Sequence, residues 1–243
     1  MRHRLLPILL GCAAAGAGAQ TLTLTLHYQD RPPYSSAAGG GAVAGLVAAP
    51  AEQALRRAGI AYTWVLTPSQ RQLALIQQGR GLDCGLGWYR NAERAALGKF
   101  SAPLYRDEPF AAIARAGVLA PGGPPTAREA LASASGSLLV KEGYSYGEYL
   151  DGLIAKARVA PQRVPVEPLQ MLRMVAAGRA GWMVATPEEA AVMLAALGPE
   201  AGALQLLRFS DVPPGQTRHL YCNHAVPDEW LARIDRALAL PGR

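Results

Sequence analysis

The segment Thr21-Leu-Thr-Leu-Thr-Leu26 alternates polar and apolar residues with a period of two, and this alternation predicts a β-strand. Helix and strand patterns then alternate, with helices expected at 45–57 and 68–76 and strands at 60–66 and 83–88. Gly59 and Gly79 lie just beyond the two expected helices and are typical C-cap residues. This strand–helix–strand–helix–strand order with short turns predicts an α/β fold with a parallel sheet and right-handed crossovers.

The second half of the chain repeats this pattern. Strands are expected at 137–141, 164–166 and 182–185, and helices at 147–156, 169–177 and 187–194. Extended segments around Phe110 and His219 connect the two halves, and a last helix is expected at 227–238. Two α/β units of similar size that are joined twice predict two lobes with a cleft, the first made of residues 20–108 and 219–243, the second of residues 109–218.

The first residues predict export. Met1-Arg2-His3-Arg4 is basic, Leu5 to Leu10 is mostly apolar, and Ala17-Gly18-Ala19 fits the small-residue rule for signal cleavage. We therefore expect residues 1–19 to be a signal peptide rather than an ordinary helix, and the mature protein to be periplasmic. Leu9-Leu10-Gly11-Cys12 is close to a lipoprotein signal, but its Leu at the middle position and the short stretch before it argue against lipidation.

Composition excludes some classes of partner. Without the signal, 224 of the 243 residues remain, with 22 Lys and Arg against 18 Asp and Glu, a net charge of +4. A nucleic-acid groove needs clustered positive charge, and the chain has no run of Lys or Arg, so no nucleic-acid partner is expected. No later apolar stretch is long enough to span a membrane.

Two cysteines, Cys84 and Cys222, remain after signal removal. In an oxidising compartment an even pair predicts a disulfide, although both lie in apolar, strand-like segments where two separate buried thiols are the alternative. Neither has a His or Cys at ligand spacing, so no metal site is expected.

One segment, Gly143-Tyr-Ser-Tyr-Gly147, matches the Gly-x-Ser-x-Gly nucleophile pattern. A hydrolase would also need an acid and a histidine, and Asp211 and His219 are too close in sequence for that fold, so no catalytic residue is assigned. The same turn before a helix can offer N–H groups and the Ser145 hydroxyl to an anion, or it is a plain strand-to-helix turn.

Ligands of such sheets bind beyond the carboxyl ends of the strands, here at 28–34, 87–94, 143–147 and 185–188. Arg94 lies there and could hold a carboxylate through two parallel bonds, unless it is a solvated surface residue. Aromatic residues often line small-molecule clefts, although several of these will be ordinary core residues: Tyr28, Tyr34, Trp88, Tyr89, Tyr144 and Tyr146.

Several segments occur in an order and spacing that can be compared with a known family: Arg31-Pro-Pro-Tyr-Ser35, Gly45-Leu-Val47, Leu73 to Gly79, Asp83-Cys-Gly-Leu-Gly-Trp88, Glu93-Arg94, Phe100-Ser-Ala-Pro-Leu-Tyr105 and His219-Leu-Tyr-Cys-Asn223. Together they resemble family 3 extracellular solute-binding proteins, the polar-amino-acid receptors of ABC transporters. The resemblance covers essentially the whole mature chain. It implies the two-lobed type II periplasmic binding fold, with a mostly parallel sheet in each lobe and two hinge crossings.

The resemblance also implies roles for individual residues. Arg94 matches the arginine that binds the ligand carboxylate, and the turn Gly143-Tyr144-Ser145 matches the donor turn of the second lobe. Other positions near the ligand are Tyr28, Arg31, Gly87, Trp88 and Tyr89. The family usually has an acid for the ligand ammonium at the position of Thr186, so either Glu188 or another acid substitutes, or the ligand is not an α-amino acid.

The expected function is a receptor that captures an amino acid or a related organic acid by lobe closure and delivers it to the membrane permease of an ABC transporter. We expect a monomer without a cofactor and without enzymatic activity. A dehydratase-like enzyme on the same scaffold is one alternative, with Glu188 and His27 as the nearby acid or base candidates. A ligand sensor without a transport role is the other.

Overall fold

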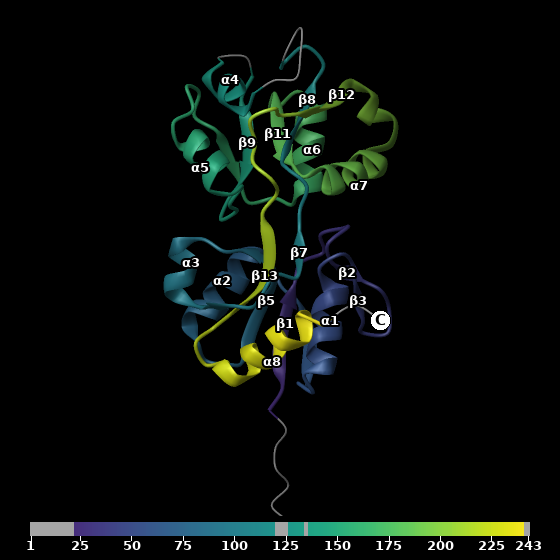
Figure 1. Ribbon diagram of the computed structural model, residues 1–243. Helices are drawn as coiled ribbons and strands as arrows, with labels where there is room; N and C mark the ends of the chain where they lie inside the picture. The colour runs from purple at the N-terminus through teal and green to yellow at the C-terminus, as the bar shows by residue number, and fades with distance from the viewer. Residues whose placement is uncertain (1–21, 120–125, 134–135, 241–243) are drawn as a thin grey trace, which may run out of the picture.

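The computed structural model describes residues 22–119, 126–133 and 136–240, which form two lobes, each built on its own sheet (Figure 1). The expected signal segment 1–19, with Cys12, lies outside the described residues, so cleavage and the absence of lipidation stay predictions. Within the described ranges, no helix has both the length and the apolar character that a membrane crossing requires.

The first lobe contains the sheet β4-β1-β5-β13-β6, with β7 also paired to β13. Its strands are β1 (Leu24–Tyr28), β4 (Tyr62–Leu66), β5 (Asp83–Tyr89), β6 (Lys99–Phe100), β7 (Tyr105–Arg106) and β13 (Thr217–Cys222). β1 pairs in parallel with β4 and β5, as the strand–helix–strand order predicts, whereas β13 runs antiparallel to β5. The antiparallel part thus comes from the strand that returns from the other lobe.

In the described part of the chain, four helices belong to this lobe: α1 (Ala48–Arg57), α2 (Ser69–Gln78), α3 (Ala92–Leu97) and α8 (Asp228–Leu238). α1 and α8 pack on each other, and α2 packs on β5. A short hairpin, β2 (Ser36–Ala37) and β3 (Val43–Ala44), occupies the Ser/Gly-rich segment for which the sequence predicted only a loop. Two-residue strands are too short to give a periodic pattern, so they were not predicted.

The second lobe contains the sheet β10-β9-β11-β8-β12. Its strands are β8 (Ala111–Arg115), β9 (Leu138–Lys141), β10 (Gln162–Val164), β11 (Trp182–Ala185) and β12 (Leu204–Arg208). β9, β10 and β11 are parallel, whereas β8 and β12 run antiparallel to their neighbours. Its helices are α4 (Ala127–Ala132), α5 (Glu148–Ala155), α6 (Pro168–Ala176), α7 (Pro187–Leu197) and the 3-10 helix η1 (Gly198–Ala203).

The central strands of the second lobe are buried on both faces. Leu138 and Val140 of β9 face one apolar cluster, while Leu139 between them faces the other. Fully burying each such side chain contributes about 1.5–3 kcal/mol. Strands that are buried on both faces show continuous apolar runs rather than polar alternation, which is why the sequence shows them as short apolar segments.

Two crossings connect the lobes. The chain leaves the first sheet after β7 and enters the second at β8, and it leaves β12 and returns at β13 (Figure 1). The division expected at residues 108 and 109 falls in the first crossing, and that expected at residues 218 and 219 falls within β13.

Cys84 of β5 and Cys222 of β13 are opposed partners in the first sheet, and the structure joins them in a disulfide. They are separated by 138 residues in the sequence, so the bond ties the returning strand to the N-terminal βαβαβ unit.

Candidate functional site

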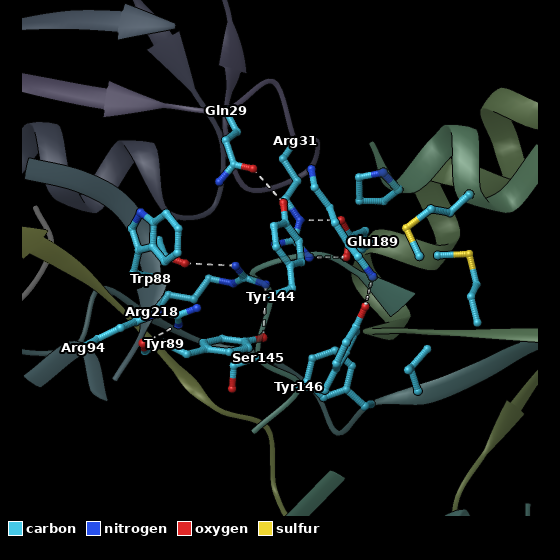
Figure 2. Close-up of a pocket in the computed structure, with 17 residues that line it drawn as sticks. Gln29, Arg31, Trp88, Tyr89, Arg94, Tyr144, Ser145, Tyr146, Glu189 and Arg218 are labelled. Atoms are coloured by element: carbon cyan, nitrogen blue, oxygen red, sulfur yellow. Dashed lines mark hydrogen bonds and ion pairs between the residues drawn. The ribbon is translucent and has the colours of Figure 1, made fainter. Parts of the chain in front are cut away.

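A pocket lies between the lobes, with an empty volume of about 570 Å³ that includes its open mouth (Figure 2). The first lobe lines it with Gln29, Arg31, Gly87, Trp88, Tyr89, Arg94 and Arg218. Residues from the first crossing onward line the other side: Phe110, Lys141, Tyr144, Ser145, Tyr146, Pro168, Met171, Met183, Val184 and Glu189.

Seven of the predicted ligand-binding residues line this pocket: Arg31, Gly87, Trp88, Tyr89, Arg94, Tyr144 and Ser145. Three others, Tyr28, Thr186 and Glu188, do not. Tyr28 ends β1 and packs edge-on against Trp64 in the first lobe, with 5.9 Å between ring centroids. Side chains alternate along an extended chain, so the next residue, Gln29, faces the pocket instead.

Thr186 and Glu188 are used by the fold. Thr186 is the N-cap of α7, is 0% exposed and shares a hydrogen bond with the Tyr34 hydroxyl. The Glu188 carboxylate accepts hydrogen bonds from the Tyr105 hydroxyl (3.0 Å) and the Glu108 amide (2.8 Å), next to the first crossing. Burial and the Glu188 hydrogen bond raise the pKa of Tyr105 to about 12. Successive helix residues differ in direction by about 100°, so Glu188 faces the crossing while its neighbour faces the pocket.

Arg94 is held in place at the start of α3, where the Asn91 side chain caps the helix by accepting from the Arg94 amide (2.8 Å). Its guanidinium donates to the Tyr89 carbonyl and to the Gly143 carbonyl of the other lobe, both at 3.0 Å, and lies 4.7 Å from the Trp88 ring centroid. The residue is only 8% exposed, and no carboxylate of the described residues forms an ion pair with it. Burial lowers the pKa of Arg94, because the desolvated cation is destabilised.

In the turn 143–147, two of the groups expected to donate to an anionic ligand are bound within the protein instead. The Ser145 hydroxyl and the Tyr146 amide donate to Asp151 of α5, at 2.5 and 2.8 Å, so these groups hold the turn against its own helix. The turn instead offers the Gly143 carbonyl to Arg94. Gly143 has φ +71°, a left-handed backbone conformation that favours glycine, and a Cβ there would lie 2.2 Å from the Gln70 amide, which would have to move.

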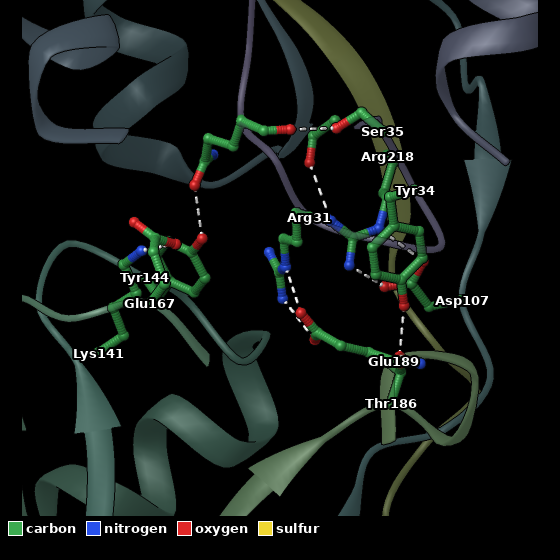
Figure 3. Close-up of polar contacts among 12 residues, drawn as sticks. Arg31, Tyr34, Ser35, Asp107, Lys141, Tyr144, Glu167, Thr186, Glu189 and Arg218 are labelled. Carbon is green, nitrogen blue, oxygen red and sulfur yellow. Dashed lines mark hydrogen bonds and ion pairs between the residues drawn. The ribbon is translucent and has the colours of Figure 1, made fainter. Parts of the chain in front are cut away.

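Arg31 and Glu189 form a bidentate ion pair across the pocket (Figure 3). The Arg31 Nε and Nη2 atoms donate to the two Glu189 oxygens at 2.6 and 2.7 Å. Arg31 also lies 4.7 Å from the Tyr144 ring centroid. Burial alone would raise the pKa of Glu189, but the charge and the hydrogen bonds of Arg31 hold it below its usual value.

A second buried ion pair joins the returning strand to the first crossing. Arg218 donates from Nε and Nη2 to the two Asp107 oxygens, both at 2.7 Å, and from Nη1 to the Gly87 carbonyl. The Tyr89 hydroxyl also donates to Asp107, and the Tyr34 ring lies 3.7 Å from the Arg218 guanidinium. Burial alone would lower the pKa of Arg218, but the charges around it raise it above its usual value.

Sequence reasoning did not assign several residues of the lining: Gln29, Phe110, Lys141, Pro168, Met171, Met183, Val184, Glu189 and Arg218. Tyr146, one of the six aromatic residues named as cleft candidates, does line the pocket. Lys141 ends the otherwise apolar β9, is 2% exposed and pairs with Glu167 at 2.5 Å, and a lone lysine in such a strand is a usable signal. The apolar members look like core residues in the sequence, so no local signal marks them.

Within residues 22–119, 126–133 and 136–240, no group of three or more His, Cys, Asp or Glu side chains is arranged to hold a metal ion. His27 lies outside the pocket lining, between Thr67 and Asp83, at 2.8 and 2.9 Å. Neither of the two acid or base candidates, His27 and Glu188, therefore lines the pocket.

Comparisons with known proteins identify the fold. No protein-family model matches the chain, and no curated protein matches it. An ancestral arginine-binding protein bound to arginine has a TM-score of 0.70 at 16% identity, covering 89% of this chain and 90% of that one. A structure from a study of glutathione import via GshT and the cystine ABC importer TcyBC of Streptococcus mutans has a TM-score of 0.72 at 13% identity, covering 89% and 87%.

A histidine kinase sensor domain with similarity to periplasmic binding proteins has a TM-score of 0.69 at 21% identity, covering 89% of each chain. These matches span nearly the whole described chain. The protein therefore has the two-lobed α/β fold of type II periplasmic binding proteins.

Proposed function

We propose that this chain is a periplasmic receptor that closes its lobes around a small carboxylate-bearing solute and delivers it to the membrane permease of an ABC transporter. The observation that supports this most directly is Arg94. Its guanidinium is buried at the pocket, and within the described ranges it has no carboxylate partner. A buried cation without a counter-ion favours an anion, and a guanidinium binds a carboxylate through parallel charge-assisted bonds.

Lobe closure is supported by the origin of the pocket's polar groups. Gln29 of the first lobe accepts from the Tyr144 hydroxyl of the second at 2.6 Å, and Arg94 donates to Gly143 across the same gap. Among the described residues, the backbone passes between the lobes at two crossings, so a hinge motion there opens and closes the pocket.

Delivery to a permease rests on the fold, on the structure connected with an ABC importer, and on the signal predicted at residues 1–19. We propose that the receptor acts as a monomer. We also propose that it acts without catalysis, because neither His27 nor Glu188, the two acid or base candidates, lines the pocket. Size-exclusion chromatography with light scattering checks the first point, and product analysis after incubation with a bound ligand checks the second.

Isothermal titration calorimetry with a panel of small carboxylates tests the binding function. At least one should bind, and Arg94→Ala should weaken it by about 2–4 kcal/mol, or about 30- to 1,000-fold, because a buried charge partner is lost. Arg90→Ala is the matched control, since Arg90 is an exposed arginine four residues earlier, and it should leave the affinity unchanged. Failure of every carboxylate to bind, or full affinity in Arg94→Ala, contradicts the proposal.

The sensor-domain match supports a second candidate, a receptor that signals through a partner protein. The transport receptor and the signalling receptor would use the same pocket, so a measurement in cells is needed to separate them. Deleting the gene should abolish uptake of the radiolabelled ligand if the protein serves transport. Normal uptake together with a lost transcriptional response to the ligand would support the sensor instead.

A further inference from the structure

The charges of the pocket are unequal. The described lining contains four cationic side chains, Arg31, Arg94, Lys141 and Arg218, but one carboxylate, Glu189. An α-amino acid brings an ammonium group as well as a carboxylate, and a closed pocket must pair that ammonium with an acid, because an unpaired buried charge is costly. The question is whether any acid near the pocket is available.

Glu189 is not available, because both of its oxygens are bound to Arg31 at 2.6 and 2.7 Å and its side chain is 3% exposed. A ligand ammonium would have to displace Arg31, whose side chain is 15% exposed, or share the Glu189 carboxylate with it. In either case one carboxylate would face two cations, and one positive charge would stay uncompensated.

Three acids near the pocket but outside its lining are also bound within the protein. Asp107 accepts from Arg218 with both oxygens and from the Tyr89 hydroxyl, and its side chain is 0% exposed. Asp151 accepts from the Ser145 hydroxyl and from a backbone amide of the same turn. Glu167 is bound to the ammonium of Lys141.

The end of β11 offers no acid either. Thr186, where the resemblance predicts an ammonium-binding acid, is neutral, buried and bonded to the Tyr34 hydroxyl. Glu188 faces the first crossing rather than the pocket.

We infer that the pocket selects an organic acid that has no ammonium group, and that it discriminates against the corresponding α-amino acid. This inference rests on the proposed function, because it concerns the ligand of the same pocket. Arg94 binds the carboxylate, and within the described lining no unpaired acid is available to an ammonium group. Met171, Met183 and Val184 provide an apolar surface for the hydrocarbon part of the ligand.

Calorimetry on the wild-type protein with matched pairs of acids tests the inference. The pairs differ only in the α-ammonium: glutarate and L-glutamate, 4-methylpentanoate and L-leucine, 3-phenylpropanoate and L-phenylalanine. In every pair that binds, the acid without the ammonium should bind at least about tenfold more tightly. Tighter binding of the amino acid overturns the inference and leaves the proposed function intact, whereas no binding by any member overturns both.

Variants test whether the preference for acids without an ammonium group arises because Glu189 is paired with Arg31. Arg31→Met frees Glu189 and should shift the preference toward the amino acid by about tenfold or more. Arg56→Met is the matched control, because Arg56 forms an ion pair with Glu52 on the exposed surface of α1, and it should leave the preference unchanged.

Gln29→Glu is a second test that does not remove the buried ion pair. Gln29 lines the pocket and accepts from the Tyr144 hydroxyl, so glutamate keeps this acceptor and adds an acid to the lining. This variant should also gain affinity for the amino acid. An unchanged preference in both folded variants would show that the paired acids do not set the selectivity, and would overturn the inference.

Discussion

Two buried arginines line the same pocket in different ways. In the Arg218 region (Arg218, Asp107 and Tyr34), the guanidinium is bound by a carboxylate of the protein and covered by an aromatic ring. In the Arg94 region (Arg94, Trp88 and Gly143), the guanidinium also lies over an aromatic ring, but its partners are carbonyl groups. Tyr89 contacts both, through its hydroxyl to Arg218 and through its carbonyl to Arg94.

The difference shows that burial and an aromatic neighbour do not by themselves mark a binding residue. The Arg218 cation is already neutralised, so it stabilises the junction of the returning strand and the first crossing. The Arg94 cation has only neutral acceptors, so an incoming anion gains more there. Arg31 is intermediate between Arg218 and Arg94. It has a carboxylate partner, as Arg218 does, but this partner comes from the opposite lobe.

The largest effect on folding should follow from removing Arg218. Arg218→Met leaves Asp107 buried without its counter-ion, and the free energy of unfolding should fall by about 3–5 kcal/mol in urea denaturation. The control Arg208→Met removes an exposed ion pair with Glu108 and should cost at most about 1 kcal/mol. Equal losses in the two variants would contradict the assigned role of the Arg218 region.

A smaller and pH-dependent effect is expected for Glu189→Gln. At neutral pH it should lower the free energy of unfolding by about 2–3 kcal/mol, because glutamine keeps a hydrogen-bond acceptor but loses the charge that pairs with Arg31. The native pKa of Glu189 is below its usual value of 4.5, so the stabilisation is present above that value and is lost as the pH falls below it.

Urea denaturation of wild type and Glu189→Gln between neutral pH and acid conditions measures this difference. The gap in stability between the two proteins should be constant at neutral pH and should narrow below the usual glutamate pKa. A gap that widens on acidification would mean that Arg31 does not stabilise the Glu189 carboxylate in the native state.

Tyr89→Phe separates the two regions. It removes the hydroxyl that donates to Asp107 and accepts from Arg218 but keeps the carbonyl that accepts from Arg94. We expect a loss of about 1–2 kcal/mol in stability and a change in ligand affinity of at most about threefold, because two buried hydrogen bonds are lost and both lie on the Arg218 side. A large loss of affinity would show that the two regions are coupled.

The smallest effect on stability is expected for Arg94→Met. Removing a buried cation that has no carboxylate partner should change the free energy of unfolding by less than about 1 kcal/mol, although ligand affinity is lost. Thermal unfolding without ligand measures the first quantity, and calorimetry measures the second. A loss of stability comparable with that of Arg218→Met would place Arg94 among the structural residues.

Much of the fold follows from local patterns in the sequence. The alternation that begins at Thr21, the apolar segments and the glycines after helices predicted the order of the main helices and strands, because periodicity and capping are properties of neighbouring residues. β12 was not predicted, since most of its residues are at least partly exposed and give no clear apolar pattern. Arg94 was identified because it follows the end of β5.

Only the tertiary structure decided which acid pairs with which arginine. Glu189 lies 158 residues from Arg31, and Asp107 lies 111 residues from Arg218, so no local pattern connects them. The choice between Glu188 and Glu189 depends on how the first turn of α7 is oriented against the first crossing. The sequence alone determined two α/β lobes and two candidate arginines, Arg31 and Arg94, whereas long-range packing determined which charges the protein neutralises and which it leaves for a ligand.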